Sequence, residues 1–325
     1  MRPDVAAWFA KRTSAGDDWD RTALLQSKGL STISVVLPAR NEAATVGEIV
    51  DRLRTELVLA IPLIDEIVVI DSGSDDHTST VARRAGAIVV RQDEILADLG
   101  DRPGKGEALW KSLFVTRGDV VAFIDADLRG FDPQFAVGLL GPLLTEPDIQ
   151  FVKGLYDRPL GAGETVLPAG GGRVTELLAR PLLNLHYPEL AGVVQPLAGE
   201  YAVRRSLLER LPFVSGYGVE IAMLVDVVEM AGLDAIAQVD LGQRVHRNSD
   251  DAALGRMAAQ VYLAMASRLE RYGRAMMTTE PSALLTQFSR SRDGFAPLVS
   301  FVGVSERPPI GTLPEYRRRT VSPSQ

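Results

Sequence analysis

Val120-Val-Ala-Phe-Ile-Asp-Ala-Asp127 places two carboxylates directly behind an apolar run that is long enough for one buried strand. Successive strand residues point to opposite faces, so Asp125 and Asp127 are expected to share one side. Two like charges crowded at a strand end are costly unless a cation lies beside them. A hard divalent cation prefers oxygen ligands and often bridges carboxylates to phosphates. The segment therefore predicts metal-assisted chemistry on a nucleotide or phosphate, with a solvated turn as the alternative.

The chain around this segment alternates short apolar runs with amphipathic stretches, the pattern of a largely parallel α/β sheet. In the first half this pattern predicts strands over 33–37, 66–70, 87–90 and 120–124 and helices over 43–57, 78–85 and 106–116. In the less regular second half it predicts strands over 150–155 and 235–241 and helices over 174–185, 219–230 and 251–272. The last fifty residues are weakly patterned, which predicts a tail that packs on a partner or frays.

Composition limits the class of protein. A chain of 325 residues with 46% hydrophobic and 24% charged residues is ordinary for one large globular domain or two closely packed ones. The net charge of −7 argues against nucleic-acid binding, which needs a basic face. The absence of cysteine excludes disulfides and thiolate metal sites and fits a cytoplasmic location. No apolar run approaches the roughly 18 residues of a membrane span, and the N-terminus lacks a signal-like apolar core.

Three loops follow predicted strands and carry polar residues: Pro38-Ala-Arg-Asn-Glu42, Asp71-Ser-Gly-Ser74 and Asp125-Ala-Asp127. In α/β proteins, ligands bind at the carboxyl ends of parallel strands, so these loops are expected to line one site. Helix caps and turns are the alternative, which explains Glu42 and Asp127 poorly. The chain lacks both the P-loop signature and the G-x-G-x-x-G fingerprint, which argues against a P-loop enzyme or a dehydrogenase.

Two glycine-rich segments carry a cation just before a predicted helix. Arg102-Pro-Gly-Lys-Gly-Glu107 holds Lys105 between two glycines, where it can reach a phosphate or a base. Gly170-Gly-Gly-Arg-Val-Thr-Glu176 presents Arg173 and Thr175 as donors for a phosphate or carboxylate. The alternatives are a surface lysine in a turn and a flexible linker.

Two further residues are candidates because of their positions. His246 ends an extended segment, so its imidazole is a candidate to complete the coordination of a metal at Asp127, with a structural histidine as the alternative. Glu220 heads a predicted apolar helix and either stabilises the helix dipole or faces a reacting carbon.

Eight motifs occur in order over residues 33–248: Val36-Leu-Pro-Ala-Arg-Asn-Glu42, Asp71-Ser-Gly-Ser74, Arg102-Pro-Gly-Lys-Gly-Glu-Ala-Leu-Trp110, Asp125-Ala-Asp127, Gly170-Gly-Gly-Arg-Val-Thr-Glu-Leu177, Gln195-Pro-Leu-Ala-Gly-Glu-Tyr201, Gly216-Tyr-Gly-Val-Glu-Ile221 and Val245-His-Arg-Asn248. Together they resemble nucleotide-sugar glycosyltransferases of the GT-A type, and within them the glucosyl- and mannosyl-3-phosphoglycerate synthases of actinobacteria.

The resemblance implies roles for individual residues. It assigns donor contacts to Pro38, Ala39, Glu42, Ser72, Lys105, Asp125 and Ala126. It assigns acceptor contacts to Gly172, Arg173, Val174, Thr175 and Asn248. It implies that Asp127 and His246 bind Mg²⁺ or Mn²⁺ on the donor diphosphate. It also implies that Glu220 lies beside the sugar and that the Leu197 carbonyl lies near the anomeric carbon.

The implied fold is a GT-A type, Rossmann-like mixed sheet flanked by helices, with a smaller acceptor-binding C-terminal part. The predicted parts are a helical extension (1–30), a nucleotide-sugar half (31–157), an acceptor- and metal-completing half (158–275) and a C-terminal tail (276–325). The implied activity is retaining transfer of glucose or mannose from UDP-glucose or GDP-mannose to the 2-hydroxyl of 3-phosphoglycerate. Alternatives are another phosphorylated or lipid acceptor, and a non-catalytic nucleotide-sugar sensor.

The family also implies a homodimer, for which the helix predicted over 251–272 is a candidate interface. The expected partners are the nucleotide-sugar donor and 3-phosphoglycerate, without nucleic acid and without stable membrane association.

Overall fold

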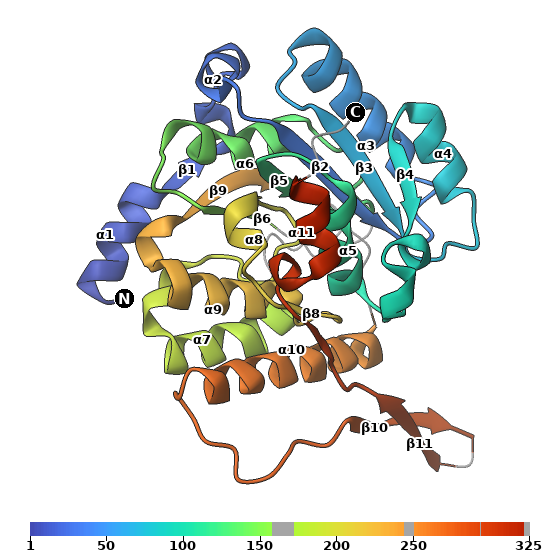
Figure 1. Ribbon diagram of the computed structural model, residues 1–325. Helices are drawn as coiled ribbons and strands as arrows, with labels where there is room; N and C mark the ends of the chain where they lie inside the picture. The colour runs from blue at the N-terminus through green and yellow to red at the C-terminus, as the bar shows by residue number, and fades with distance from the viewer. Residues whose placement is uncertain (158–171, 244–249, 293, 322–325) are drawn as a thin grey trace.

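The computed structural model describes residues 1–157, 172–243, 250–292 and 294–321. Within these ranges eight strands form one mixed sheet in the order β1-β9-β6-β7-β5-β2-β3-β4 (Figure 1). The strands are β1 Thr13–Ala15, β2 Ile33–Ala39, β3 Glu66–Asp71, β4 Ile88–Arg91, β5 Val120–Phe123, β6 Phe151–Asp157, β7 Tyr201–Arg204 and β9 Ile236–Gln243. β7 runs antiparallel to both of its neighbours, whereas the other pairings in this sheet are parallel.

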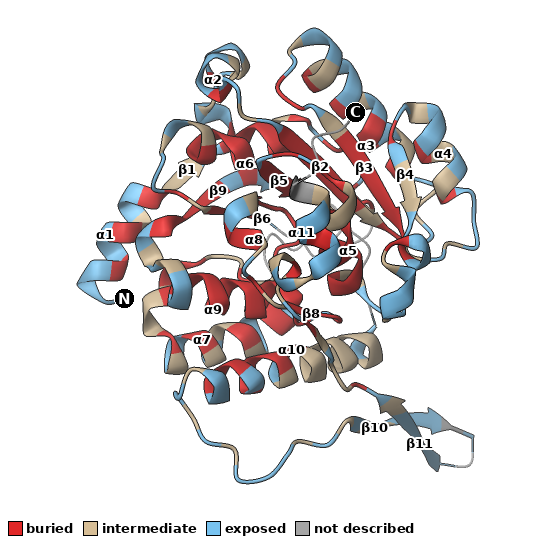
Figure 2. Cartoon of the chain, in the orientation of Figure 1, coloured by how far each residue is buried: buried red, intermediate tan, exposed pale blue. Residues whose placement is uncertain are grey.

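Helices cover both faces of the sheet and bury two apolar cores (Figure 2). The helices are α1 Pro3–Arg12, α2 Arg21–Lys28, α3 Val46–Leu53, α4 Thr78–Ala85, α5 Lys105–Val115, α6 Gln134–Thr145, α7 Arg180–His186, α8 Arg205–Leu208, α9 Val219–Ala231, α10 Asp251–Arg271 and α11 Pro314–Val321. Alternate residues of one strand enter opposite cores: Val35 and Leu37 pack with α3 and α6, whereas Val36 packs with α5 and α9. Because both faces of the sheet are covered, the strands read in the sequence as nearly continuous apolar runs, which is the basis of the strand predictions.

The predicted α/β sheet is confirmed, with differences at the ends of elements. The helix predicted over 43–57 begins at Val46 and continues after α3 as a π-helical stretch, Arg54–Ala60. The helix predicted over 174–185 is a π-helical stretch, Thr175–Ala179, followed by α7. The short antiparallel strand β7 was not predicted, because its pairing with β5 and β6 depends on residues far away in the sequence.

The C-terminal segment differs from the expectation of a fraying tail. β10 Leu284–Ser291 and β11 Gly294–Phe301 form a hairpin that projects from the body of the molecule (Figure 1). After it, β12 Glu306–Arg307 pairs with β8 Phe213–Val214, and α11 follows. The tail expectation was therefore wrong for residues 302–321. Their anchors are arginine and aromatic side chains, which a hydrophobic periodicity does not detect.

The sheet crosses the predicted division of the chain, because β1 comes from the N-terminal extension and β9 from the acceptor half. The boundaries at residues 30, 157 and 275 stay predictions. Among the described residues no helix combines the length and apolar character that crossing a bilayer requires.

Candidate active site

A cleft of about 1250 Å³ opens at the carboxyl ends of β2, β3 and β5. Every predicted site residue that the structure describes lines it: Pro38, Ala39, Glu42, Ser72, Lys105, Asp125, Ala126, Asp127, Gly172, Arg173, Val174, Thr175, Leu197 and Glu220. His246 and Asn248 lie outside the described residues. The structure thus brings together residues that lie up to 182 positions apart in sequence (38 to 220), while their individual roles stay predictions.

The rim of the cleft is made by the loops after β2 and β3, which are hydrogen-bonded to each other. The Asn41 amide nitrogen donates to Ser74 Oγ at 2.9 Å, and the Ser74 amide nitrogen donates to Asp71 Oδ1 at 2.8 Å. Asn41 has a φ of 61°, a left-handed conformation that asparagine tolerates better than most residues. The Ser72 hydroxyl donates to Gln92 Oε1 at 2.7 Å. These contacts hold the predicted donor residues of both loops at one rim.

The carboxylate pair lies in a turn just beyond β5, because the strand ends at Phe123. The alternation of exposed and buried side chains nevertheless continues past the strand: Asp125 and Asp127 are partly exposed and line the cleft, and Ala126 between them is buried. The Thr45 hydroxyl donates to the Ala126 carbonyl at 2.6 Å and ties this turn to the loop after β2. The prediction that both carboxylates face one place is therefore confirmed.

Glycine is required at position 199 by the close approach of this turn. A Cβ atom there would lie 2.2 Å from Asp125 Oδ2, far inside van der Waals contact. The segment before β7 therefore packs directly against the carboxylate pair and forms part of the cleft wall with Leu197 and Gly199.

Lys105 is a cation of the cleft that pairs with two carboxylates. Its Nζ lies 2.5 Å from Asp125 Oδ1 and 2.9 Å from Glu220 Oε1, so it bridges the turn after β5 and the start of α9. Burial alone would lower the pKa of Lys105, but the carboxylates of Asp125 and Glu220 raise it well above its usual value. The ammonium therefore stays charged and stabilises two carboxylates that would otherwise repel each other.

The loop that carries Lys105 is pressed against β8. A Cβ atom on Gly106 would lie 1.8 Å from the Val214 carbonyl oxygen, and one on Gly104 would lie 2.5 Å from that of Ser215. The two glycines that flank Lys105 are therefore needed for close packing of backbone on backbone. This contact fixes where α5 begins and where the lysine points.

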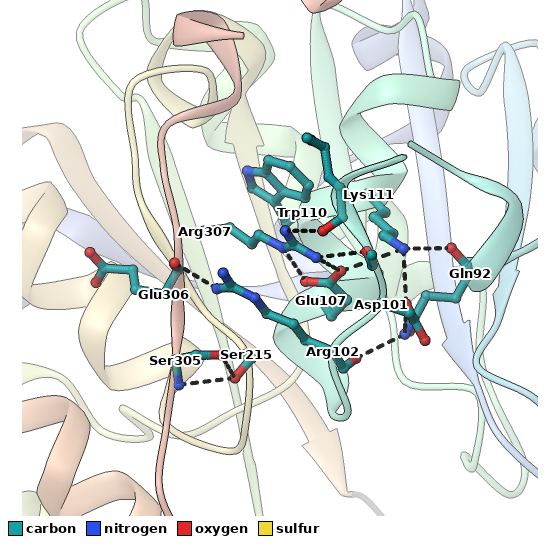
Figure 3. A network of polar contacts seen from close by, with 12 residues as sticks. Gln92, Asp101, Arg102, Glu107, Trp110, Lys111, Ser215, Ser305, Glu306 and Arg307 are labelled. Carbon is teal, nitrogen blue, oxygen red and sulfur yellow. Dashed lines mark hydrogen bonds and ion pairs between the residues drawn. The ribbon is translucent and has the colours of Figure 1, made fainter. Parts of the chain in front are cut away.

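Residues 305–308, which include β12 beside β8, also hold this loop, and we call them the C-terminal strap (Figure 3). The Arg307 guanidinium donates two hydrogen bonds to the buried Glu107 carboxylate, at 2.8 and 2.7 Å. Arg102 donates to the Glu306 carbonyl at 2.7 Å, and Trp110 Nε1 donates to the Pro308 carbonyl at 2.8 Å. The last part of the chain therefore holds the lysine loop in place.

Another part of the cleft wall is the start of the helical segment that contains Thr175. Gly172 has a φ of 82°, which a glycine adopts without strain, and its carbonyl accepts from the Glu176 amide at 3.0 Å. Arg173 forms an ion pair with Asp251 at the start of α10. The guanidinium, the Thr175 hydroxyl and the backbone amides of a helix start suit the binding of an anion.

The oxygen ligands in the cleft fit a divalent cation. Asp125 and Asp127 supply hard carboxylate oxygens beside open space, which suits Mg²⁺ or Mn²⁺ bound together with a phosphate. In the parts of the chain that the structure describes, no group of three or more His, Cys, Asp or Glu side chains is suited to hold a metal. The ligand set predicted here would need His246 and oxygens from the bound diphosphate.

Several cleft residues were not predicted. Gln92, Asp101, Val304 and Ser305 line the cleft, and Lys153 lies buried beneath it. Gln92 begins a short 3-10 helix and Asp101 lies in a loop, neither within a recognisable motif, and Ser305 belongs to the strap. Lys153 did have a signal, since a lysine inside the apolar run of a predicted strand is unusual.

The mixed sheet with a carboxylate pair and a lysine at its strand ends defines a glycosyltransferase of the GT-A type, and residues 34–162 match the model of glycosyl transferase family 2. The chain is 44% identical to the glucosyl-3-phosphoglycerate synthase of Petrotoga mobilis, over 91% of either sequence. The chain belongs to the family of glucosyl- and mannosyl-3-phosphoglycerate synthases.

Solved structures agree with this family. The mannosyl-3-phosphoglycerate synthase of Rubrobacter xylanophilus matches with a TM-score of 0.86 and 43% identity, covering 94% of this chain and 97% of that one. The glucosyl-3-phosphoglycerate synthase of Mycobacterium tuberculosis, in complex with Mn²⁺, UDP-glucose and phosphoglyceric acid, matches with a TM-score of 0.79 and 46% identity. That match covers 90% of this chain and 94% of the other.

Arg307→Met is expected to loosen the lysine loop, because it removes the bidentate partner of the buried Glu107 carboxylate. Breaking a buried ion pair costs about 3–5 kcal/mol, and the expected loss lies at the low end because Lys111 Nζ remains 3.5 Å from Glu107. Hydrogen–deuterium exchange of residues 99–107 should become faster. Arg318→Met, which removes an exposed arginine of α11, is the control. Unchanged exchange in Arg307→Met would contradict the clamping role of the strap.

Proposed function

We propose that this chain is a retaining hexosyltransferase that moves glucose or mannose from a nucleotide sugar to the 2-hydroxyl of 3-phosphoglycerate. The observation that carries the proposal is the bridge of Lys105 between Asp125 and Glu220, in a cleft that also holds Asp127. The same cleft is lined by Arg173 and Thr175, whose side chains suit an anionic acceptor. The family supports the same reaction, since its M. tuberculosis member binds UDP-glucose and phosphoglyceric acid together with Mn²⁺.

The donor is proposed to bind along the rim of the cleft. Pro38, Ala39, Glu42 and Ser72 would contact the nucleoside, and Asp125 would accept its hydrogen bonds. Asp127 with His246 would hold Mg²⁺ or Mn²⁺. When bound, the cation supplies positive charge for the diphosphate leaving group. Lys105 adds a preorganised ammonium at the same place, so charge that grows as the glycosidic bond breaks is stabilised.

The acceptor is proposed to bind at the wall formed by Gly172, Arg173, Val174 and Thr175, with Asn248 completing the site. 3-Phosphoglycerate carries a phosphate and a carboxylate, and a guanidinium at a helix start holds such groups through charge-assisted hydrogen bonds. Fixing the acceptor at both ends would orient its 2-hydroxyl against the sugar, which supplies much of the barrier reduction.

The pairing of Glu220 with Lys105 supports a mechanism in which the acceptor attacks from the same face of the sugar that the diphosphate leaves. Its Oε1 accepts from Lys105 Nζ at 2.9 Å, and a carboxylate held by an ammonium is a weaker nucleophile than a free one. We therefore infer that Glu220 positions Lys105 and the sugar. A departing phosphate oxygen would then take the proton of the acceptor hydroxyl on the face where the new bond forms.

Two alternatives keep the fold. One is a different phosphorylated acceptor, or a lipid acceptor, in place of 3-phosphoglycerate. The other is a non-catalytic sensor, which would need the carboxylate pair and Lys105 for binding alone. A cytoplasmic location is proposed as well, supported by the absence of cysteine from the sequence.

A coupled assay for nucleoside diphosphate release tests the proposed reaction. Release is expected only when donor, 3-phosphoglycerate and Mg²⁺ or Mn²⁺ are all present, and chelation of the metal should abolish it. A panel with UDP-glucose, GDP-glucose, UDP-mannose and GDP-mannose would identify the donor. The sensor alternative instead predicts donor binding without turnover. Absence of release from all four donors would overturn the proposed activity.

Arg173→Ala is expected to weaken acceptor use selectively. A hydrogen bond to a charged group contributes about 1.5–3 kcal/mol, which corresponds to a rise of about ten- to a hundredfold in the KM for 3-phosphoglycerate. The KM for the donor should change little. Arg83→Ala, at an exposed arginine of α4, is the matched control. If Arg173→Ala left the acceptor KM unchanged, the acceptor would have to bind elsewhere.

We propose a homodimer whose interface is the β10–β11 hairpin, while the helix predicted over 251–272 (α10) stays an untested candidate interface. One face of this hairpin carries large apolar side chains that are at least 60% exposed: Leu284, Phe288, Phe295, Val299 and Phe301. An isolated two-stranded hairpin is marginally stable in water, and an apolar face of this kind marks an interaction site. A second copy of the chain presents the same face, so a twofold axis would cover both faces at once.

Phe288→Asp with Val299→Asp is expected to separate the dimer, because two charges would have to be buried in an apolar interface. Light scattering after size exclusion should then give the monomer mass of 35.2 kDa rather than twice that value. Ser289→Asp, on the opposite face of the same hairpin, should leave the mass unchanged. A monomeric unmodified chain would exclude the hairpin as a dimer interface.

A further inference from the structure

Lys153 is a charged residue in the middle of the central sheet. It belongs to β6, where its register partners are Tyr201 of β7 and Gln238 of β9, and it is 1% exposed. Burial of an ammonium is costly unless polar groups replace its water shell. A lysine in this position therefore needs a reason beyond packing.

The contacts of Lys153 point toward the cleft. Its Nζ donates a hydrogen bond to the Ala198 carbonyl at 2.7 Å and lies 4.8 Å from the ring centre of Tyr201. The cation–π contact partly replaces the lost hydration of the ammonium. The hydrogen bond connects the lysine to a residue that lies between two cleft residues, Leu197 and Gly199.

Three hydrogen bonds attach the segment 195–200 to β6. The Gly154 amide donates to the Glu200 carbonyl at 2.9 Å, and the Gln195 side-chain amide donates to the Tyr156 carbonyl. Lys153 supplies the third bond, at the middle of the segment and closest to the cleft. On its other side the segment packs on Asp125 through Gly199, so a small displacement would disturb the carboxylate pair.

We propose that Lys153 is a positioning residue, whose buried ammonium holds the Ala198 carbonyl and so presents Leu197 and Gly199 to the sugar of the donor. The inference rests on the proposed transferase activity and deepens it. Leu197 is the residue whose carbonyl is expected near the anomeric carbon. A shift of this segment would therefore change the rate of transfer more than the affinity for either substrate.

The charge of Lys153 adds a pH dependence. Burial lowers the pKa of Lys153 to about 7. The carboxylates of Glu220, Glu200 and Asp125 act in the opposite direction and raise this pKa, whereas the positive charge of Lys105 lowers it further. The aromatic neighbour of Lys153 is Tyr201. Burial raises the pKa of Tyr201 well above its usual value, so the Tyr201 hydroxyl stays neutral. Above pH 7 the lysine becomes an amine, which is a weaker donor than an ammonium.

The contribution of Lys153 to the stability of the fold changes with pH in the direction opposite to its contribution to kcat. The lysine of the unfolded chain keeps its proton to about pH 10.4, so between the two pKa values the unfolded state binds more protons. The contribution of Lys153 to stability therefore rises with pH over this range. A fall of kcat above pH 7 without loss of stability would separate the positioning role from general unfolding.

Steady-state kinetics of two variants test the proposal. Lys153→Met removes the ammonium and keeps the length of the side chain, so kcat should fall by about ten- to a hundredfold, as for a misplaced reacting group, with small changes in both KM values. Lys153→Arg keeps a charge that does not titrate, so it should retain activity above pH 7 and lose the decline of kcat there. Circular dichroism melting would monitor the fold.

Lys28→Met is the matched control. Lys28 is also a buried lysine that donates to a backbone carbonyl, that of Pro62 at 3.2 Å, but it lies outside the cleft. Its kcat should equal that of the unmodified chain. If the unmodified chain is active and Lys153→Met is equally active, the positioning role is overturned, whereas the proposed transferase activity is not affected. If Lys153→Met fails to fold, a kcat of the unmodified chain that stays constant from pH 6 to 9 overturns it.

Discussion

The constraint on which the rest of the site depends is the concentration of negative charge at one end of the sheet. Asp125, Asp127 and Glu220 face one cleft, and Lys105 lies between two of them at hydrogen-bonding distance. Like charges this close are tolerated only beside a cation. Much of the surrounding structure holds this one ammonium in place, through two glycines packed on β8 and through the C-terminal strap.

The site is assembled by contacts between distant parts of the chain. The first half supplies the rim, the carboxylate pair and Lys105, whereas Glu220 and the wall at Thr175 come from the second half. β7 joins them, because it lies antiparallel between β5 and β6 and brings the segment before it against Asp125. In this arrangement one sheet would serve both the proposed donor side and the proposed acceptor side.

Local patterns predicted much of this correctly. The apolar runs of β2, β3 and β5 are strands, and the polar loops that follow them meet at one edge of the sheet, as the rule for parallel strands requires. β7, the strap and the role of Lys153 were not predictable in this way. Each depends on pairing or hydrogen bonding between residues tens to hundreds of positions apart, which leaves no periodic signal.

The sequence by itself determined the α/β class, the family and the set of candidate site residues, because these follow from residue types and short spacings that are local to the chain. Only the tertiary structure decided that Lys105 pairs with both Asp125 and Glu220, that Arg307 locks its loop, and that Lys153 supports the segment beside Leu197. The physical reason is distance: charge–charge and hydrogen-bond energies act over a few ångströms in space, and folding alone sets which distant residues come that close.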